Sequence, residues 1–336
     1  MHQRTIVRSV AVGAIALVAL TGCRPSDSAP SGSGESEPLT LVLGHAGSDT
    51  DARQDASIRF AELVSEASDG QITVEIHPAS TLGTWEEMIE GLQLGSTDIV
   101  IESLLSLESY TELASVETAP FLYEDYDQFE AVWSGDLGTE IVDAVSEASG
   151  YEPIGNLYRG PRVLTTSDPV ASIADVQGMT IRTPSAPTML QTWESIGARA
   201  EALPFNEVYS ALESGVIDGQ ENPVDAILFN SIYEVNPYIA ETNHVYANYH
   251  FILWEEALEG LTDEQQTIIR DAAEQVGVEY TENTIAQNEE YRAELEAGGA
   301  VFAEITDRDA WVEATQPVVD GLPDQVQTWV EEIRAM

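Results

Sequence analysis

The amino-acid sequence predicts an α/β fold built from about two domains, and three observations support this prediction. Short stretches that alternate apolar and polar residues are followed, repeatedly along the chain, by stretches whose apolar residues recur at helical spacing. Two segments, Thr84–Glu87 and Thr262–Gln265, match the capping box that begins many helices. The length of 336 residues suits two domains of ordinary size.

The first unit, residues 39–77, predicts two parallel strands joined by a helix. Leu39–Leu43 alternates apolar and polar side chains, and residues 55–67 place apolar side chains at helical spacing. Gly70 is the expected end of that helix, and residues 71–77 alternate again. Because a strand–helix–strand connection returns the chain in the same direction, we expect the two strands to pair in parallel.

The middle of the chain continues this alternation of strands and helices. The capping box at Thr84 begins a helix that we expect to end at Gly95. Further elements are expected to be a strand at 96–101, elements beginning at 120–122 and 125–133, a helix at 136–149, strands at 162–166 and 179–182, and a helix at 188–196.

Two further helices are expected in the C-terminal half. Asn206 is expected to cap a helix that continues through Leu212 and stops before Gly215, and residues 216–217 then lead into a turn at 218–219. The second helix begins at the capping box of residues 262–265 and continues to about residue 297, where two glycines follow. A helix of that length can pack across more than one domain.

The N-terminus has the features of an export signal. The apolar run Val10–Leu20 follows a short positive region and is shorter than a membrane-spanning helix. It ends in Leu20-Thr21-Gly22-Cys23, which is similar to a bacterial lipobox. We expect residues 1–22 to be a lipoprotein signal peptide, Cys23 to carry the lipid, and residues 23–38 to form a flexible tether. The alternative is an ordinary secretion signal with an incidental cysteine.

Acidic residues dominate the charge of the chain. Its 59 Asp and Glu stand against 13 Arg and no Lys, so the formal net charge is −46. Without Lys there is no Walker-type phosphate loop, no Schiff-base lysine and no basic patch suited to nucleic acid. The charge fits either a halophilic source, where about 1 M salt shortens the Debye length to roughly 3 Å, or a well-solubilised exported protein.

The sequence lacks the usual signatures of catalysis and of cofactor binding. Cys23 is the only cysteine, so neither an intramolecular disulfide nor a paired-cysteine site can form. The five His residues show no metal-ligand spacing, and the motifs HExxH, GxSxG and GxGxxG are absent. We therefore expect no metal or cofactor, and a binding protein is favoured over an enzyme.

Several segments resemble the solute receptors of TRAP (tripartite ATP-independent periplasmic) transporters, the DctP family. In order they are Ser80–Gly83, Pro120–Leu122, Gly178–Pro184, Pro204–Tyr209 and Ala211–Pro223. The resemblance extends from about residue 38 to 330. It implies a fold like that of periplasmic binding proteins, with two α/β lobes joined by hinge strands and a long C-terminal helix. Lobe I would hold residues 39–158 and about 246–287, and lobe II residues 159–245 and about 288–336.

The resemblance also implies a function. Such a receptor binds a small organic carboxylate between its lobes and delivers it to a permease of two integral-membrane subunits. We expect a monomer that is not an enzyme, held by its lipid on the outer face of the cytoplasmic membrane. The positions that match ligand-contacting positions of the family are Arg182, Arg162, Asn222, Phe205, His244, Glu102, His45 and Trp85.

The chemistry of these residue types fits a carboxylate ligand. The planar guanidinium of Arg182 can donate two parallel hydrogen bonds to a carboxylate, and Arg162 can assist it. Four of the 13 Arg lie between residues 159 and 199, which would make the potential locally positive. Each residue also has an alternative structural role: either Arg can pair with a nearby acid, Asn222 can form a turn before Pro223, and the others can pack or be solvated.

Two other functions stay open at this point. One is a secreted hydrolase or lyase in which Glu102, with His45 or His244, forms an acid–base pair. The other is a sensor domain that hands its ligand to a signalling receptor rather than to a permease. Both would keep the α/β scaffold.

Overall fold

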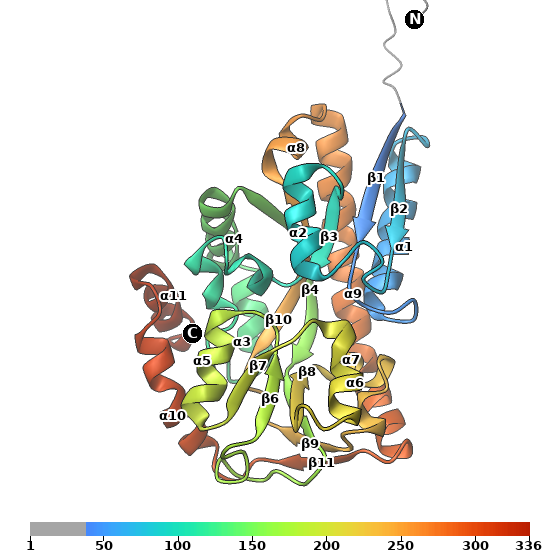
Figure 1. The fold of residues 1–336 in the computed structure, drawn as a ribbon. Helices are drawn as coiled ribbons and strands as arrows, with labels where there is room; N and C mark the ends of the chain where they lie inside the picture. Colours follow the sequence, from blue (N-terminus) through green and yellow to red (C-terminus); the bar gives the residue numbers. More distant parts are fainter. Residues whose placement is uncertain (1–37) are drawn as a thin grey trace, which may run out of the picture. The chain divides into compact units, whose positions relative to one another are not determined.

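The computed structural model describes residues 38–336, which belong to a single compact unit containing two β-sheets (Figure 1). The predicted signal peptide, the lipidation site Cys23 and all but the last residue of the predicted tether lie outside the described residues. None of the described helices is both long enough and apolar enough to cross a membrane.

The first sheet has five strands in the order β2-β1-β3-β10-β4. Their bounds are β1 Leu39–Gly44, β2 Ile72–His77, β3 Ile99–Glu102, β4 Tyr151–Pro161 and β10 Tyr246–Trp254. Strand β1 pairs in parallel with both β2 and β3, whereas β10 runs antiparallel to β3 and β4. The parallel pairing of β1 with β2 confirms the prediction for residues 39–77.

The second sheet has six strands in the order β11-β9-β5-β8-β6-β7. Their bounds are β5 Val163–Thr166, β6 Thr180–Thr183, β7 Arg199–Ala202, β8 Gly219–Asn222, β9 Tyr238–Glu241 and β11 Val301–Glu304. Strands β6, β7 and β8 are parallel to one another, and β5 runs antiparallel to β8 and β9. Mixed sheets of this kind are common in α/β proteins.

Helices cover both sheets. The α-helices are α1 Ala52–Ala67, α2 Trp85–Leu94, α3 Tyr126–Trp133, α4 Asp136–Ser149, α5 Pro187–Ile196, α6 Val208–Glu213, α7 Val224–Phe229, α8 Glu255–Glu259, α9 Asp263–Ala297, α10 Arg308–Asp320 and α11 Asp324–Arg334. The short 3₁₀ helices are η1 Leu104–Leu107, η2 Glu112–Val116, η3 Phe205–Glu207 and η4 Ile232–Glu234. The first sheet with α1–α4 and α8 is called lobe I, and the second sheet with α5–α7 is called lobe II.

The chain crosses directly from one sheet to the other at two neighbouring places. Strand β4 ends at Pro161 and β5 begins at Val163, so Arg162 alone separates strands of different sheets. In the opposite direction, residues 242–245 connect β9 to β10. The two crossovers are joined by a hydrogen bond from the Arg162 N–H to the Val245 carbonyl at 2.8 Å. These adjoining extended segments are suited to act as hinges, as expected for a two-lobed fold.

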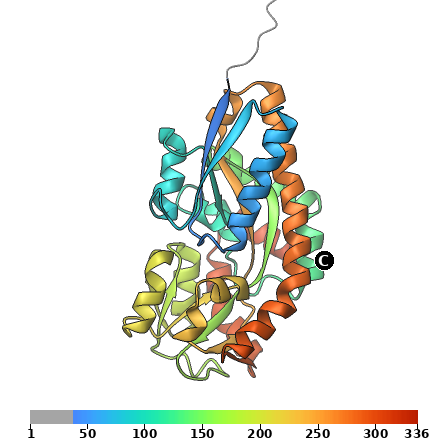
Figure 2. The same ribbon diagram turned by 90° about the vertical axis from the view of Figure 1, so that its right-hand side faces the viewer.

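The long helix α9 runs past both lobes, as Figure 2 shows. It packs on β4 and α1 in lobe I and on α7 in lobe II. Glycines allow its close approach to β4: a Cβ at Gly277 would lie 2.9 Å from the backbone N and O of Asn156, and one at Gly155 would lie 2.6 Å from the Ala273 carbonyl oxygen. The predicted helix from the capping box at Thr262 to about residue 297 is confirmed.

The last two helices belong to different lobes, whereas the sequence placed all of residues 288–336 in lobe II. Trp311 of α10 is buried against Trp193 of α5, with ring centres 6.2 Å apart, so α10 packs on lobe II. Helix α11 instead contacts η2, and its buried Trp329 and Ile333 join the hydrophobic core of lobe I. The physical reason is the apolar face of α11, which becomes buried only against lobe I.

Two local predictions near residue 210 are wrong. Asn206 caps no helix, because it lies inside η3, and α6 begins only at Val208. Residues 218–219 form no turn, because the Asp218 N–H bonds to the Thr180 carbonyl at 2.8 Å and β8 begins at Gly219. A Cβ at Gly219 would lie 2.6 Å from the Thr165 carbonyl oxygen. This glycine therefore allows close strand packing and does not mark a turn.

Candidate ligand-binding cleft

A narrow cleft lies where the chain crosses between the sheets, and both lobes contribute to its walls. It encloses about 40 Å³. Its lining residues are Ala46, Arg53, Trp85, Glu102, Leu105, Arg159, Arg162, Arg182, Pro184, Phe205, Asn222 and Tyr249. All predicted ligand-binding residues except His45 and His244 are among them, so the fold brings together side chains that are more than a hundred residues apart in sequence.

Arg182 is a buried cation that has no anionic partner in the described part of the chain. It lies on β6 and is 2% exposed. Its Nε and Nη2 donate to the Leu203 carbonyl oxygen at 2.8 and 2.6 Å, and no carboxylate oxygen of residues 38–336 lies within 4.0 Å of it. Burial lowers the pKa of Arg182 to about 10. A buried charge left unpaired is unfavourable, and an anionic ligand would relieve that cost.

Arg162, in contrast, is fully paired within the protein. Its Nε and Nη2 donate to the carboxylate of Glu221 on β8, and Nη2 also donates to the Glu221 carbonyl at 2.7 Å. His244 Nε2 lies 3.1 Å from the same carboxylate, and its Nδ1 lies 2.8 Å from the Thr242 hydroxyl. Burial by itself would raise the pKa of Glu221, but Arg162 and His244 lower it to about 2. His244 therefore supports Glu221 from behind the cleft and does not line it.

Asn222 and Phe205 form the wall of lobe II beside Arg182. Asn222 follows Glu221 on β8 and donates from Nδ2 to Gln220 Oε1 at 2.7 Å, which holds its amide in place. The ring centre of Phe205 lies 5.9 Å from the guanidinium carbon of Arg182 and 5.9 Å from that of Arg53 in lobe I. The aromatic ring thus lies near cations that come from different lobes.

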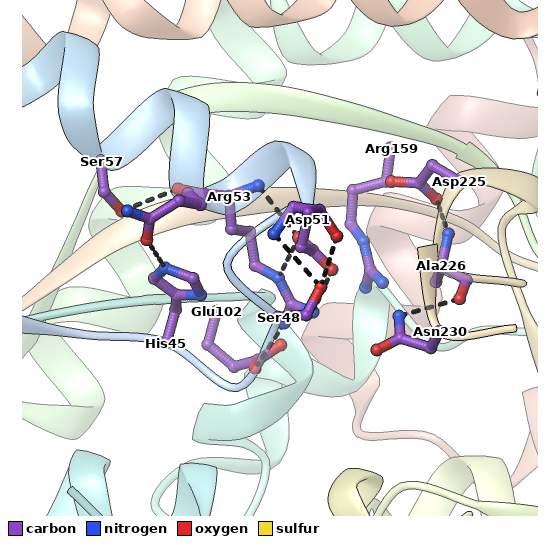
Figure 3. A network of polar contacts seen from close by, with 12 residues as sticks. His45, Ser48, Asp51, Arg53, Ser57, Glu102, Arg159, Asp225, Ala226 and Asn230 are labelled. Atoms are coloured by element: carbon purple, nitrogen blue, oxygen red, sulfur yellow. Dashed lines mark hydrogen bonds and ion pairs between the residues drawn. The ribbon is translucent and has the colours of Figure 1, made fainter. Parts of the chain in front are cut away.

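A hydrogen-bonded network forms the wall of lobe I (Figure 3). Arg53 donates to Asp51 through two nitrogens, at 2.9 and 3.0 Å, and its Nη1 lies 3.7 Å from Glu102 Oε2. Asp51 also begins α1 by accepting the Arg53 backbone N–H, which explains why α1 starts one turn before the predicted residue 55. Arg53 is therefore neutralised, and Glu102 presents a carboxylate to the cleft.

The two remaining predicted residues differ in position. His45 is fully buried outside the cleft lining, and its Nε2 lies 3.0 Å from Gln54 Oε1. Burial lowers the pKa of His45 to about 4, so the imidazole is neutral at pH 7. Trp85 lines the cleft at the start of α2 and also packs in the core of lobe I. Within the described residues neither His45 nor His244 hydrogen-bonds Glu102, so the acid–base pair considered for a hydrolase or lyase is not assembled.

Sequence reasoning missed six lining residues, and three of them carry polar side chains: Arg53, Arg159 and Tyr249. The Tyr249 ring on β10 lies under both arginines, with guanidinium carbons 4.8 Å (Arg53) and 3.8 Å (Arg159) from the ring centre. The scarcity of arginine was the available signal, since Arg159 belongs to the cluster between residues 159 and 199. Arg53 gave no signal, because an arginine just before a predicted amphipathic helix is typically exposed to solvent.

A larger hollow lies elsewhere on lobe I, among α4, β4 and α9, with a volume of about 800 Å³. Its charged lining residues are Asp143, Glu147, Glu152, Glu255, Glu259, Arg270 and Glu274. The one arginine in that lining donates to Glu152 at 2.9 Å. An anion would be repelled there, so the narrow cleft is the better site for an acidic ligand despite its smaller size. In residues 38–336, no group of three or more His, Cys, Asp or Glu is arranged to hold a metal ion.

Glu117 makes protein stability depend on pH from just behind the cleft. Its carboxylate accepts the backbone N–H groups of Leu105 at 2.7 Å and Asn248 at 3.0 Å. Burial raises the pKa of Glu117 to about 7, against an ordinary value of about 4.3 in an unfolded chain. The folded protein thus holds this proton more tightly. The stability that this tighter proton binding contributes is fully present below about pH 4.3 and is lost as the pH rises through about 7.

Glu117→Gln is therefore expected to remove a pH-dependent component of stability. Between about pH 4 and pH 8, the unfolding free energy of the natural chain should fall by about 3 kcal/mol more than that of the variant. Urea unfolding across that range measures the difference, and Glu304→Gln at an exposed position is the control. A difference that stays constant with pH would contradict the assignment, because the lost backbone hydrogen bonds alone do not titrate.

Comparison with known proteins identifies the family. Residues 43–325 match the DctP family model, described as bacterial extracellular solute-binding protein, family 7. A solute-binding protein of Roseobacter denitrificans is 32% identical over 298 residues, which cover 88% of this chain and 91% of that protein. The chain belongs to the DctP family. The family is one of solute-binding receptors, and its relatives include periplasmic proteins, which fits the predicted extracytoplasmic location.

Solved structures of TRAP and sugar-acid receptors share the fold of this DctP-family chain. A TRAP periplasmic solute-binding protein of Roseobacter denitrificans with bound L-galactonate has a TM-score of 0.83 and 31% identity, covering 88% of this chain and 99% of that one. A sugar acid-binding protein of Advenella mimigardefordensis in complex with galactonate has a TM-score of 0.83 and 28% identity, covering 88% and 97%. These neighbours confirm the predicted two-lobed fold.

Proposed function

We propose that this DctP-family protein is a receptor that captures a small organic acid in the cleft between its lobes and delivers it to a TRAP-type transporter. The observation that carries the proposal is Arg182, a buried cation that lines the cleft without a carboxylate partner in residues 38–336. Its guanidinium is held in place by the Leu203 carbonyl, and the remaining N–H groups can bind a carboxylate.

Ligand binding favours a closed arrangement of the lobes because both lobes supply cleft residues. Two contacts already connect the lobes beside the cleft: the Ser185 hydroxyl donates to Glu86 at 2.8 Å, and the Thr188 backbone N–H donates to Glu108 at 2.8 Å. A cleft of about 40 Å³ is too narrow for a six-carbon acid. The lobes therefore separate about the crossovers at residue 162 and residues 242–245 to admit it, and a ligand bound by both lobes favours an arrangement closed around the ligand over the fully open one.

A sugar acid is the ligand class that the cleft supports best. Relatives of known structure hold L-galactonate and galactonate. In this chain, hydrogen-bond acceptors lie beside the cations: the Glu102 carboxylate in lobe I and the Asn222 amide in lobe II. A sugar acid carries hydroxyl groups that can donate to these acceptors while its carboxylate meets Arg182.

The proposed receptor acts as a monomer on the outer face of the cytoplasmic membrane, tethered by a lipid on Cys23, and contacts two integral-membrane permease subunits. The lipobox-like segment ending at Cys23 and the Ser-, Gly- and Pro-rich residues after it support the anchor. Replacing Cys23 by Ser should release the protein from the membrane fraction of its natural host. Release into the soluble fraction would leave ligand binding intact, because the cleft lies in residues 46–249.

The experiment that tests the proposal is a thermal-shift screen of the full chain against about a hundred organic acids, including galactonate. A specific ligand raises the melting temperature because it stabilises the folded state by RT ln(1 + [L]/Kd). The acid should be recovered unchanged after the complex is denatured. Conversion of the acid to a product would support the hydrolase or lyase instead, and an absence of any shift would contradict the receptor. Neighbouring genes for two multi-span membrane proteins would favour transport over signalling.

A further inference from the structure

A second cation in the cleft has no carboxylate partner in the described part of the chain, and the function proposed above does not use it. Arg159 lies on β4, is 5% exposed and lines the same cleft as Arg182. Among residues 38–336 its side chain makes one hydrogen bond, from Nη1 to the Ser103 hydroxyl at 2.9 Å. No carboxylate oxygen of those residues lies within 4.0 Å of it, and its buried Nε has no hydrogen-bond partner.

The guanidinium of Arg159 is nevertheless held in a defined place. Its carbon lies 3.8 Å from the centre of the Tyr249 ring, and the Ser103 hydroxyl fixes one end. Figure 3 shows Arg159 extending in the same direction as Arg53, toward the level of Glu102. Nε and Nη2, the pair of nitrogens that forms one edge of the guanidinium, hydrogen-bond no group of residues 38–336. Such an edge matches the two oxygens of a carboxylate.

The charges that line the cleft do not balance inside the protein. Four arginines line it, and two of them are neutralised: Arg53 by Asp51 and Arg162 by Glu221. Glu102 lies 3.7 Å from Arg53, which already pairs with Asp51. The two arginines that pair with no carboxylate of residues 38–336 come from different sheets, Arg159 from the first and Arg182 from the second.

Two carboxyl groups near Arg159 offset its charge only partly. Glu117 and Asp225 are both buried, and neither has an oxygen within 4.0 Å of the guanidinium. Burial raises the pKa of Glu117 to about 7 and that of Asp225 to about 6, so near pH 7 the Glu117 carboxyl is partly protonated and the Asp225 carboxyl is mostly ionised. Glu117 also directs both oxygens to backbone N–H groups. Neither carboxyl therefore occupies the hydrogen-bonding edge of Arg159 that a ligand carboxylate would meet.

We infer that the cleft binds a dicarboxylic acid, with one carboxylate on Arg182 of lobe II and the other on Arg159 of lobe I. This inference rests on the proposed receptor function and specifies its ligand class as a sugar diacid. The hydroxyl groups between the two carboxylates face Glu102 and Asn222. Because each carboxylate is held by a different lobe, a diacid also couples binding to closure more strongly than a monoacid does.

Galactonate and galactarate are matched probes, because they share one carbon skeleton and differ only in whether the sixth carbon is a hydroxymethyl or a carboxylate. Isothermal titration of the full chain should show galactarate binding at least about tenfold more tightly than galactonate. Gluconate and glucarate form a second pair that tests whether the preference depends on hydroxyl stereochemistry. Arg159→Gln should weaken the binding of galactarate at least about tenfold more than that of galactonate, so the variant should no longer prefer the diacid.

Three variants make the outcome decisive. Arg182→Gln should weaken both acids of a pair, Arg159→Lys should retain part of the diacid preference through its charge, and Arg199→Gln, at an exposed position of β7, should change neither. Equal affinities of the natural chain for the diacid and the monoacid of each pair would overturn the inference. It would also be overturned if Arg159→Gln and Arg159→Lys each weakened diacid and monoacid binding by the same factor. In that event Arg182-dependent binding of the monoacids would still support the receptor, whereas binding of no acid by the natural chain would contradict the receptor itself.

Discussion

Arg182→Ala is expected to weaken the binding of galactonate, or of any acid found in the screen, by at least about a hundredfold. The variant loses the charged hydrogen bonds to the ligand carboxylate, and no nearby cation of lobe II can replace them, because Glu221 occupies Arg162. Isothermal titration measures the loss. The affinity of Arg182→Lys should lie between those of the natural chain and of Arg182→Ala, since lysine keeps the charge but not the planar pair of donors.

The same change should leave the fold intact. Arg182 pairs with no carboxylate among residues 38–336, so its removal strands no buried anion; it ends the hydrogen bonds to Leu203 and the contact with the Phe205 ring. The free energy of unfolding should therefore stay within about 1 kcal/mol of the natural value. Arg199→Ala, at an exposed site in the neighbouring strand, is the matched control. Affinity retained within about threefold by Arg182→Ala would refute the role assigned to this residue.

Glu221→Ala is expected to give the largest loss of stability, about 3–5 kcal/mol in unfolding free energy. Glu221 and Arg162 are both fully buried at the crossover between the sheets, and the change leaves the Arg162 charge without a partner. It also removes the hydrogen bond to His244. Urea unfolding monitored by circular dichroism measures the difference.

An exposed ion pair supplies the control for this prediction. Glu279 pairs with Arg59 through two hydrogen bonds, at 2.8 and 3.1 Å, but both side chains are 38% exposed. Glu279→Ala should cost less than about 1 kcal/mol. The double variant Arg162→Met with Glu221→Leu should be more stable than Glu221→Ala, because it buries no unpaired charge. A Glu221→Ala variant as stable as Glu279→Ala would disprove the argument.

Local patterns were sufficient to predict many elements of the fold. The capping boxes at Thr84 and Thr262 begin α2 and α9 in the structure, because a capping box depends on residues three positions apart. The parallel pairing of β1 and β2 follows from the helix between them. Elements defined by distant contacts were harder to predict. A turn was predicted at residues 218–219, where β8 begins, because an Asp-Gly pair is typical of turns and the extended form of β8 depends on β5 and β6.

In the candidate site, too, the sequence predicted which positions are involved but not every side chain that faces the cleft. The resemblance to the DctP family placed Arg182, Asn222, Phe205, Glu102 and Trp85 at positions that do line the cleft. It also placed His45 and His244 there, but both are buried outside its lining. Whether a polar residue faces the cleft or a neighbouring side chain depends on rotations and partners that a position in a motif does not specify.

By itself, the sequence determined that this is an acidic α/β chain with few cations, all of them arginine, and with the segments of a solute receptor. The tertiary structure alone decided which arginines are available to a ligand. Arg53 and Arg162 are neutralised by Asp51 and Glu221, whereas Arg159 and Arg182 have no carboxylate oxygen within 4.0 Å among residues 38–336. The physical reason is that pairing depends on distances of a few ångströms between atoms of residues up to 59 positions apart. Folding sets those distances, and the number of charges in the chain does not.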